Sequence, residues 1–167
     1  VQLFGELSLL ENVMVGLKHT YRGGVGDVAL ATPRARREEA AARLRAASLL
    51  GFVGLEALAH EEARNLPYGK QRLLEIALAL ATKPKVLLLD EPAAGVPREE
   101  SAELFTAVTN LSTDITVLFI EHDMDFVFRF ASRIIVLVGG KILLEGTPGE
   151  ISADPRVREV YLGGAHH

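Results

Sequence analysis

The chain contains no cysteine, so disulfide bonds and thiolate metal sites are excluded. Long apolar runs are missing as well. Although 49% of the residues are hydrophobic, no run reaches the roughly 18 residues that a membrane-spanning helix needs. A basic excess is also lacking, because the formal net charge is -4, which argues against a nucleic-acid partner. With no signal-peptide pattern at the start, these absences indicate a soluble cytoplasmic domain.

The phosphate-binding loop of nucleotide-binding proteins is a further absence. A Gly-x-x-x-x-Gly-Lys-Ser/Thr pattern occurs nowhere in the 167 residues. Gly23, Gly24 and Gly26 lack the Lys-Ser or Lys-Thr pair that would follow, so they predict a turn-rich surface loop. This sequence therefore provides no backbone cradle or lysine for the β- and γ-phosphates of a nucleotide.

The basic residues that are present gather in one segment, which also contains acidic residues. The arginines are Arg34, Arg36, Arg37, Arg43 and Arg45, and they are interleaved with Glu38 and Glu39. Alternating charges of this kind are typical of a solvated helix surface. We therefore favour a solvated helix over a polyanion-binding site.

The N-terminal part is expected to be almost wholly helical. Ser8 and Glu11 have the spacing of a capping box and predict a helix start. Thr32-Pro33 predicts a second start, with threonine as the N-cap and proline in the first turn. That helix is expected to run to about Leu50, with Gly51 as its left-handed stop.

From residue 68 onward, helices alternate with strands. The expected elements are a helix over Lys70–Ala81, a strand over Val86–Leu89, a helix over Arg98–Leu111, a strand over Thr116–Ile120, a helix over Met124–Ala131, a hairpin of Ile134–Val138 and Lys141–Glu145, and short helices near Pro148 and Pro155. The first two strands are continuously apolar, which predicts burial on both faces of a parallel sheet. We therefore expect an α/β fold with a mostly helical subdomain over 1–67 and a second part over 68–167.

Three sequence features carry candidate chemistry. Asp90 and Glu91 directly follow a predicted buried strand, where α/β proteins place their ligands, so one carboxylate can hold Mg²⁺ and the other can orient or deprotonate a water. His122 follows the second buried strand and can donate a hydrogen bond to a phosphate or to that water. The stretch Leu66–Arg72 runs from a turn into a helix, where free N–H groups attract phosphate and Gly69 permits close approach.

Each feature also has a plain structural reading: a strand end that begins a turn, an inconsequential histidine and an ordinary loop-to-helix junction. Their order and spacing decide between the readings. Leu-Pro-Tyr-Gly-Lys-Gln-Arg, then Leu-Leu-Leu-Asp-Glu-Pro, then Glu-His-Asp resemble the signature, Walker B and switch-histidine motifs of ABC transporter ATPases. Ala93-Ala94-Gly95, Glu145-Gly146-Thr147-Pro148 and Tyr161-Leu162-Gly163 are similar to the branched-chain amino acid importer branch.

The resemblance implies the C-terminal part of a P-loop ATPase core that lacks Walker A and the Q-loop. It implies that Glu91 is the catalytic base, that Asp90 serves Mg²⁺ and that His122 senses the γ-phosphate. The residues implied to contact the ATP of a partner subunit in trans are Leu66, Pro67, Tyr68, Gly69, Lys70 and Gln71. Pro67 replaces the usual serine and Pro97 the usual Asp or Asn of the D-loop, so both depart from the family pattern.

The implied machine is a homo- or heterodimer of ATPase subunits on the inner face of the cell membrane. The dimer would drive membrane permease subunits, and a periplasmic solute-binding protein would deliver branched-chain amino acids to them. Alternatives are an importer of another small molecule such as urea or an amide, a non-catalytic interaction module, and, disfavoured by the acidic charge, an ABC ATPase of DNA repair or translation. Because the phosphate cradle is missing, the chain alone is predicted to be inactive and to bind ATP weakly at best.

Overall fold

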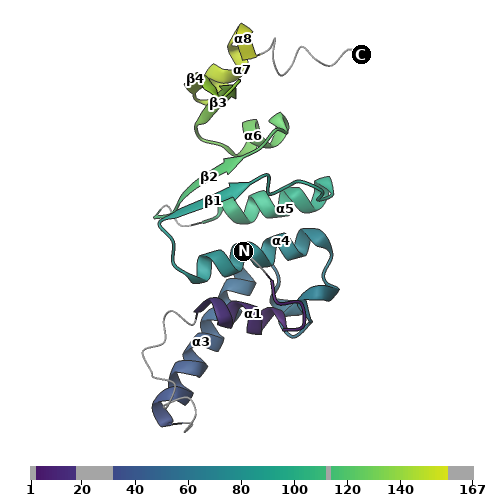
Figure 1. Ribbon diagram of the computed structural model, residues 1–167, viewed down its shortest axis with the longest axis vertical. Helices are drawn as coiled ribbons and strands as arrows, with labels where there is room; N and C mark the ends of the chain where they lie inside the picture. Colours follow the sequence, from purple (N-terminus) through teal and green to yellow (C-terminus); the bar gives the residue numbers. More distant parts are fainter. Residues whose placement is uncertain (1–2, 18–31, 112–113, 158–167) are drawn as a thin grey trace. The chain divides into compact units, whose positions relative to one another are not determined.

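The computed structural model describes residues 3–17, 32–111 and 114–157 (Figure 1). The chain divides into two compact units, Val1–Phe119 and Ile120–His167. The predicted glycine loop at 23–26 and the motif Tyr161-Leu162-Gly163 lie outside the described residues. Within the described residues, no helix combines the length and the apolar character that crossing a membrane requires. The predicted division at residue 68 stays a prediction.

Helix α1, Leu9–Gly16, begins at the predicted capping box. The Glu11 N–H donates to Ser8 Oγ at 3.2 Å, and the Ser8 N–H donates to the Glu11 carboxylate at 2.9 Å. Asn12, fully buried, ties down the preceding turn, because its amide oxygen accepts from the Phe4 N–H at 2.9 Å. The sequence prediction of this helix start is confirmed.

Helix α3, Pro33–Phe52, begins at the predicted N-cap Thr32, whose hydroxyl accepts from the Ala35 N–H at 3.2 Å. Its predicted end was wrong. Gly51 stays inside the helix, and the left-handed residue is Gly54, with φ 74°. The Gly54 N–H donates to the Gly51 carbonyl at 3.1 Å, and the Leu55 N–H donates to the Leu50 carbonyl at 2.8 Å. This pair of bonds is a Schellman motif, which needs positive φ one residue after the C-cap and therefore at Gly54.

Two short 3₁₀ turns, η2 (Glu56–Leu58) and η3 (Ala63–Asn65), lead to helix α4, Tyr68–Ala81. The segment between them runs beside the start of α1, where the Leu9 N–H donates to the Glu61 carbonyl at 3.0 Å. Helix α4 begins two residues before the predicted Lys70 and ends at the predicted residue, three positions ahead of Pro84. Helices α1, α3 and α4 pack together around a buried apolar core. That core holds Leu9, Val13, Leu50, Leu74 and Ala77.

Strand β1 (Val86–Asp90), helix α5 (Arg98–Thr109) and strand β2 (Thr116–Ile120) follow, and the two strands form one hydrogen-bonded pair. The strand arrows point the same way, so the pair is parallel, and α4 and α5 lie on the same side of it (Figure 1). Phe105 of α5 packs edge-on against Phe119 of β2, with ring centroids 5.3 Å apart. The sequence predicted both strands, α5 and their α/β arrangement correctly.

The apolar runs indicate strands that can be buried on both faces, but within the described part of this chain only one face of each strand is covered. Leu87 is buried, but Leu88 beside it is 68% exposed. Successive side chains of a strand point to opposite faces, so one face is covered and the other is open. The side chains of the open face are Val86, Leu88, Leu118 and Ile120. The physical reason is that α4 and α5 both lie on the same side of the pair (Figure 1).

The second unit contains helix α6 (Met124–Phe130), strands β3 (Ile134–Val138) and β4 (Lys141–Gly146), and helices α7 (Pro148–Ala153) and α8 (Pro155–Val157). The two strands pair antiparallel, with a register irregularity between Val136 and Leu137. Their turn is Gly139-Gly140, where both residues have positive φ, 57° and 76°. This is the two-residue hairpin that the sequence predicted, since such turns favour glycine at both positions.

Candidate functional site

The start of α4 leaves backbone N–H groups available to an anion. Its N-cap is Pro67, and no described side chain caps the first turn. The Gln71 side chain instead folds back and donates to the Leu66 carbonyl at 2.9 Å, which fixes the entering turn. A helix start of this kind attracts negative charge through its free N–H groups and the helix dipole.

Gly69, in this first turn, is in close contact with α5. A β-carbon at this position would lie 2.0 Å from Glu100 Oε2 and 3.0 Å from Val96 Cγ1. Glu100 Oε2 is buried and accepts no hydrogen bond from any described residue. Packing between α4 and α5 is therefore sufficient to require glycine here. The close approach of a phosphate, from which the sequence analysis argued, stays a prediction.

Tyr68 and Arg72, one turn apart on α4, form a polar cluster beside Gly69. The Arg72 guanidinium lies 5.0 Å from the centre of the Tyr68 ring and donates to the Tyr68 hydroxyl. It also donates to the Glu75 carboxylate at 2.8 Å, which is the main reason that the pKa of Arg72 is raised above its ordinary value. Arg72 therefore remains positively charged at any physiological pH.

Asp90 and Glu91 lie at the carboxyl end of β1, as predicted. Asp90 is the last strand residue and Glu91 is exposed just beyond it. Glu91 has φ 42°, in the left-handed region that non-glycine residues seldom adopt. Lys83, just before β1, shares this conformation with φ 53°, so the backbone angle supports a functional role for Glu91 only together with its place after the strand. The next turn is closed by the Ala94 N–H, which donates to the Glu91 carbonyl at 3.0 Å.

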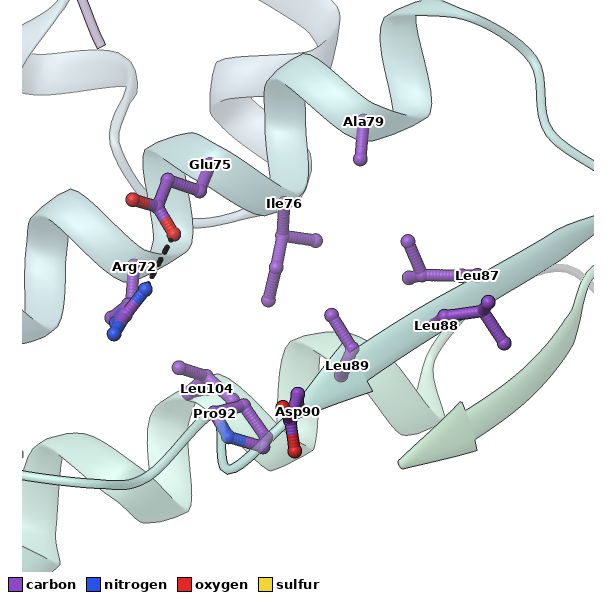
Figure 2. A pocket seen from close by; sticks show the side chains of 10 residues that line it. All are labelled: Arg72, Glu75, Ile76, Ala79, Leu87, Leu88, Leu89, Asp90, Pro92 and Leu104. Atoms are coloured by element: carbon purple, nitrogen blue, oxygen red, sulfur yellow. Dashed lines mark hydrogen bonds and ion pairs between the residues drawn. The ribbon is translucent and has the colours of Figure 1, made fainter. Parts of the chain in front are cut away.

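A hollow of about 210 Å³ separates α4 from β1 (Figure 2). Arg72 and Ile76 point into it from α4, and Asp90 lies at the strand end that closes one side. The structure thus brings the predicted signature helix and the predicted Walker B strand to the walls of one hollow. The sequence placed both motifs but gave no sign that they share this space.

The turn between β1 and α5 also reaches the start of α4. Gly95, with φ 73°, faces the Tyr68 ring, because a β-carbon there would lie 3.5 Å from Tyr68 Cε1. Ser101, buried at the start of α5, donates to the Pro97 carbonyl at 3.0 Å and holds the turn to the helix. Sequence reasoning missed the contacts of Gly95 and Glu100 with α4, because no local pattern marks a contact between residues almost thirty positions apart.

His122 belongs to the second unit, exposed between β2 and α6. The next residue, Asp123, is the N-cap of α6 and accepts from the Asp125 N–H at 3.0 Å. The position after the second strand agrees with the sequence analysis. The sensing role assigned to His122 stays a prediction.

The residues present fit Mg²⁺ and a nucleotide phosphate in part. In the described ranges, no three His, Asp or Glu side chains are arranged to hold a metal ion. A Mg²⁺ ion at Asp90 would therefore take most of its ligands from water and phosphate, as this ion commonly does. The uncapped start of α4 fits a phosphate, although the Glu100 side chain packs against its first turn.

Two family models match the chain. The model described as "ABC transporter" matches residues 1–94, and the model described as "Branched-chain amino acid ATP-binding cassette transporter" matches residues 141–167. The first match covers the start of α4, β1 and the acidic pair. The second begins with strand β4.

Curated relatives match over nearly the whole chain. The branched-chain amino acid transport ATP-binding protein LivG of Salmonella typhimurium is 42% identical over 99% of this chain and 66% of its own length. BraF of Pseudomonas aeruginosa, with the corresponding description, is 39% identical over the same shares. The chain thus spans just under two thirds of the length of these relatives.

Solved structures agree with the fold. The ADP conformation of MJ1267, an ATP-binding cassette of an ABC transporter, is 31% identical with a TM-score of 0.74, over 95% of this chain and 64% of that one. The dimeric structure of MJ0796, a bacterial ABC transporter cassette, is 28% identical with a TM-score of 0.68, over 88% and 59%. Because the ABC transporter model matches residues 1–94, more than half of the 167 residues, this chain belongs to the ABC transporter family.

Proposed function

We propose that this chain is part of the ATP-hydrolysing subunit of an ABC importer for branched-chain amino acids. The observation that carries the proposal is the shared hollow between α4 and β1, where Arg72 of the signature helix and Asp90 of the Walker B strand line the same space. The relatives' described role in branched-chain amino acid transport supports the choice of solute.

In this proposal the residues at the end of β1 position and activate the water that attacks the γ-phosphate. Bound Mg-ATP supplies the phosphoryl group that is transferred to that water. Asp90 binds Mg²⁺, directly or through water, and Glu91 orients the attacking water and accepts its proton. The left-handed backbone at Glu91 turns the chain sharply after the strand, so the two carboxylates need not point to the same place. His122 donates a hydrogen bond to the γ-phosphate.

The start of α4 serves the nucleotide of a second subunit. Its free N–H groups and the helix dipole bind the phosphate of that nucleotide. The hydrogen bond from Gln71 to the Leu66 carbonyl holds the preceding turn, so that these N–H groups keep one orientation. The residues in this role are Leu66, Pro67, Tyr68, Gly69, Lys70 and Gln71. Pro67 contributes neither a hydroxyl nor an N–H, so backbone groups after it provide the contact. The contact of Gly95 with Tyr68 links this surface to the turn that follows the acidic pair.

The partners follow from the same proposal. Two ATPase subunits, identical or different, pair across the α4 start, and the pair acts on membrane permease subunits at the inner face of the membrane. A periplasmic solute-binding protein delivers the solute. The runner-up is an importer of urea or another amide, which would use the same ATPase chemistry and differ in its permease and binding protein.

The direct test is Glu91→Gln in the full-length protein that contains this chain. We expect ATP binding to persist and phosphate release to slow at least about 100-fold, because a positioned base contributes roughly 10²–10⁴ to the rate. The matched control is Glu99→Gln, the same change on an exposed side chain of α5, which should leave the rate within a few-fold of wild type. Turnover of Glu91→Gln close to wild type would remove Glu91 from the mechanism.

The solute is tested by uptake into vesicles that contain the cognate permease and binding protein. We expect ATP-dependent accumulation of labelled leucine and no accumulation of labelled urea. The opposite result would establish the runner-up, since the ATPase chemistry is common to both.

A further inference from the structure

Positive charge is concentrated on one helix of this otherwise acidic chain. Five arginines against two glutamates give α3 a formal charge of +3, whereas the whole chain carries -4. The alternating charges of this segment are typical of a solvated helix. The structure adds the arrangement of these side chains around the helix and the identity of the face that packs on the rest of the unit.

Helix α3 packs through a single stripe. Ala42, Ala46 and Leu50 are buried against α1 and α4. Each residue turns an α-helix by about 100°, so Leu44 lies opposite this stripe, and it is 74% exposed. The described elements that make the most contact with α3 are α1, α4 and η2.

Exposed arginines lie on the same helix as Leu44, two of them about two turns before it and one directly after it. We call this surface the arginine face and define it as Arg36, Arg37, Leu44 and Arg45. None of its three arginines forms an ion pair with a residue that the structure describes, whereas Arg34 is held by Glu38 at 3.2 Å. The face therefore combines one exposed apolar side chain with three arginines that pair with no described carboxylate.

We propose that the arginine face docks on the anionic headgroups of a membrane leaflet. This inference rests on the proposed function, which brings the subunit to the inner face of a membrane. Guanidinium groups bind phosphate oxygens in a bidentate manner. Leu44 adds one exposed apolar side chain, which can enter the boundary between headgroups and acyl chains.

Charge argues for lipid rather than for the permease as the occupant. Cytoplasmic loops of membrane proteins carry an excess of Lys and Arg, so they would repel a face made of arginines. The cytoplasmic leaflet has a negative surface potential, which attracts basic segments. Each arginine near such a surface favours binding roughly fivefold, and three give a factor on the order of 100.

The test measures binding of the full-length protein to vesicles by flotation, without nucleotide. Phosphatidylcholine vesicles are compared with vesicles that also contain phosphatidylglycerol, at about 0.1 M salt, where screening is moderate. We expect the anionic vesicles to bind on the order of 100-fold more tightly. The triple variant Arg36→Gln, Arg37→Gln, Arg45→Gln should lose that difference, and Leu44→Ser should weaken binding roughly tenfold.

A matched control removes three arginines elsewhere that are already paired with carboxylates. It combines Arg64→Gln, Arg133→Gln and Arg156→Gln, which changes the net charge by the same amount. We expect this control to bind anionic vesicles within a few-fold of wild type. An equal loss in the control would reduce the effect to net charge and overturn the proposal. Binding to an acidic peptide or a nucleic acid, without binding to either kind of vesicle, would also overturn it.

The two proposals fail separately. Vesicle binding is measured without nucleotide, and the arginine face contains no residue of the proposed nucleotide site. ATP hydrolysis by the triple variant should stay within a few-fold of wild type. A wild-type protein that hydrolyses ATP but does not bind anionic vesicles would refute only the docking surface. A wild-type protein that binds the vesicles but does not hydrolyse ATP would refute only the proposed function.

Discussion

Gly69 at the start of α4 has no room for one more carbon atom, whereas Leu88 in β1, within the same compact unit, is 68% exposed. The first region finds its packing partner, Glu100 of α5, within this chain. The second lies on the open face of the β1–β2 pair, which no described helix of the first unit covers. The packing around Gly69 is therefore complete within this chain, whereas the open face of the β1–β2 pair is not covered by any described helix of the first unit.

The open face is costly to leave in water. Burying one leucine or isoleucine side chain is worth about 1.5–3 kcal/mol, and this face exposes four large apolar side chains. Exposed apolar patches on strands seek partners. We therefore expect the open face to associate with another apolar surface in solution.

The largest effect is expected from the open face itself. The 167-residue chain in isolation should self-associate through it, and the double variant Leu88→Lys, Leu118→Lys should raise the dissociation constant at least about 100-fold, because two buried leucines are lost. Sedimentation equilibrium measures this constant. Leu44→Lys on α3 is the control and should leave association unchanged. A wild-type chain that stays monomeric at high concentration would contradict the prediction.

A smaller effect is expected at the completed contact. Gly69→Ala should lower the free energy of unfolding by about 1–2 kcal/mol, because the added methyl group meets Glu100 at 2.0 Å and overpacking outweighs the better helix propensity of alanine. Urea denaturation measures the change. Glu100→Ala in the same chain should recover part of the loss, since it removes the obstructing carboxylate.

The matched control is Gly51→Ala in α3. A β-carbon there meets only Glu56 Oε2 at 3.5 Å, an ordinary contact, so helix propensity should dominate and stabilise the chain by up to about 1 kcal/mol. Opposite signs at the two glycines are therefore expected. The same sign at both positions would mean that the contact between α4 and α5 is not tight in solution.

The smallest effect is expected on the pKa of a carboxyl group in the second unit. The Arg156 side chain, aided by its backbone N–H, lowers the pKa of Asp154 from 3.8 to about 2. A depressed carboxylate pKa adds stability above its unfolded value and loses it as the pH falls from about 4 toward 2. Arg156→Gln should move the pKa of Asp154 back toward 3.8, as followed by NMR, while that of Glu150, which is lowered by Thr147, stays where it is.

Local signals in the sequence predicted most of the secondary structure. The structure has the capping box at Ser8 and Glu11, the N-cap at Thr32 and the Gly139-Gly140 turn at the predicted residues. The end of α3 was wrong because two glycines lie within four residues, and only the hydrogen bonds decide which adopts positive φ. The candidate roles of Asp90 and Glu91 came from their place after a strand, which the structure confirms while their roles remain predictions.

The sequence by itself determined the strands, the helices and the order of the motifs, because caps, turns and apolar runs act over a few neighbouring residues. Tertiary structure alone decided which face of β1 is covered, that Gly69 meets Glu100, and that Arg72 and Asp90 line one hollow. An apolar strand has the same composition whether one face or two are buried. Burial depends on where helices pack, and contacts between residues about twenty to thirty positions apart leave no local pattern to detect.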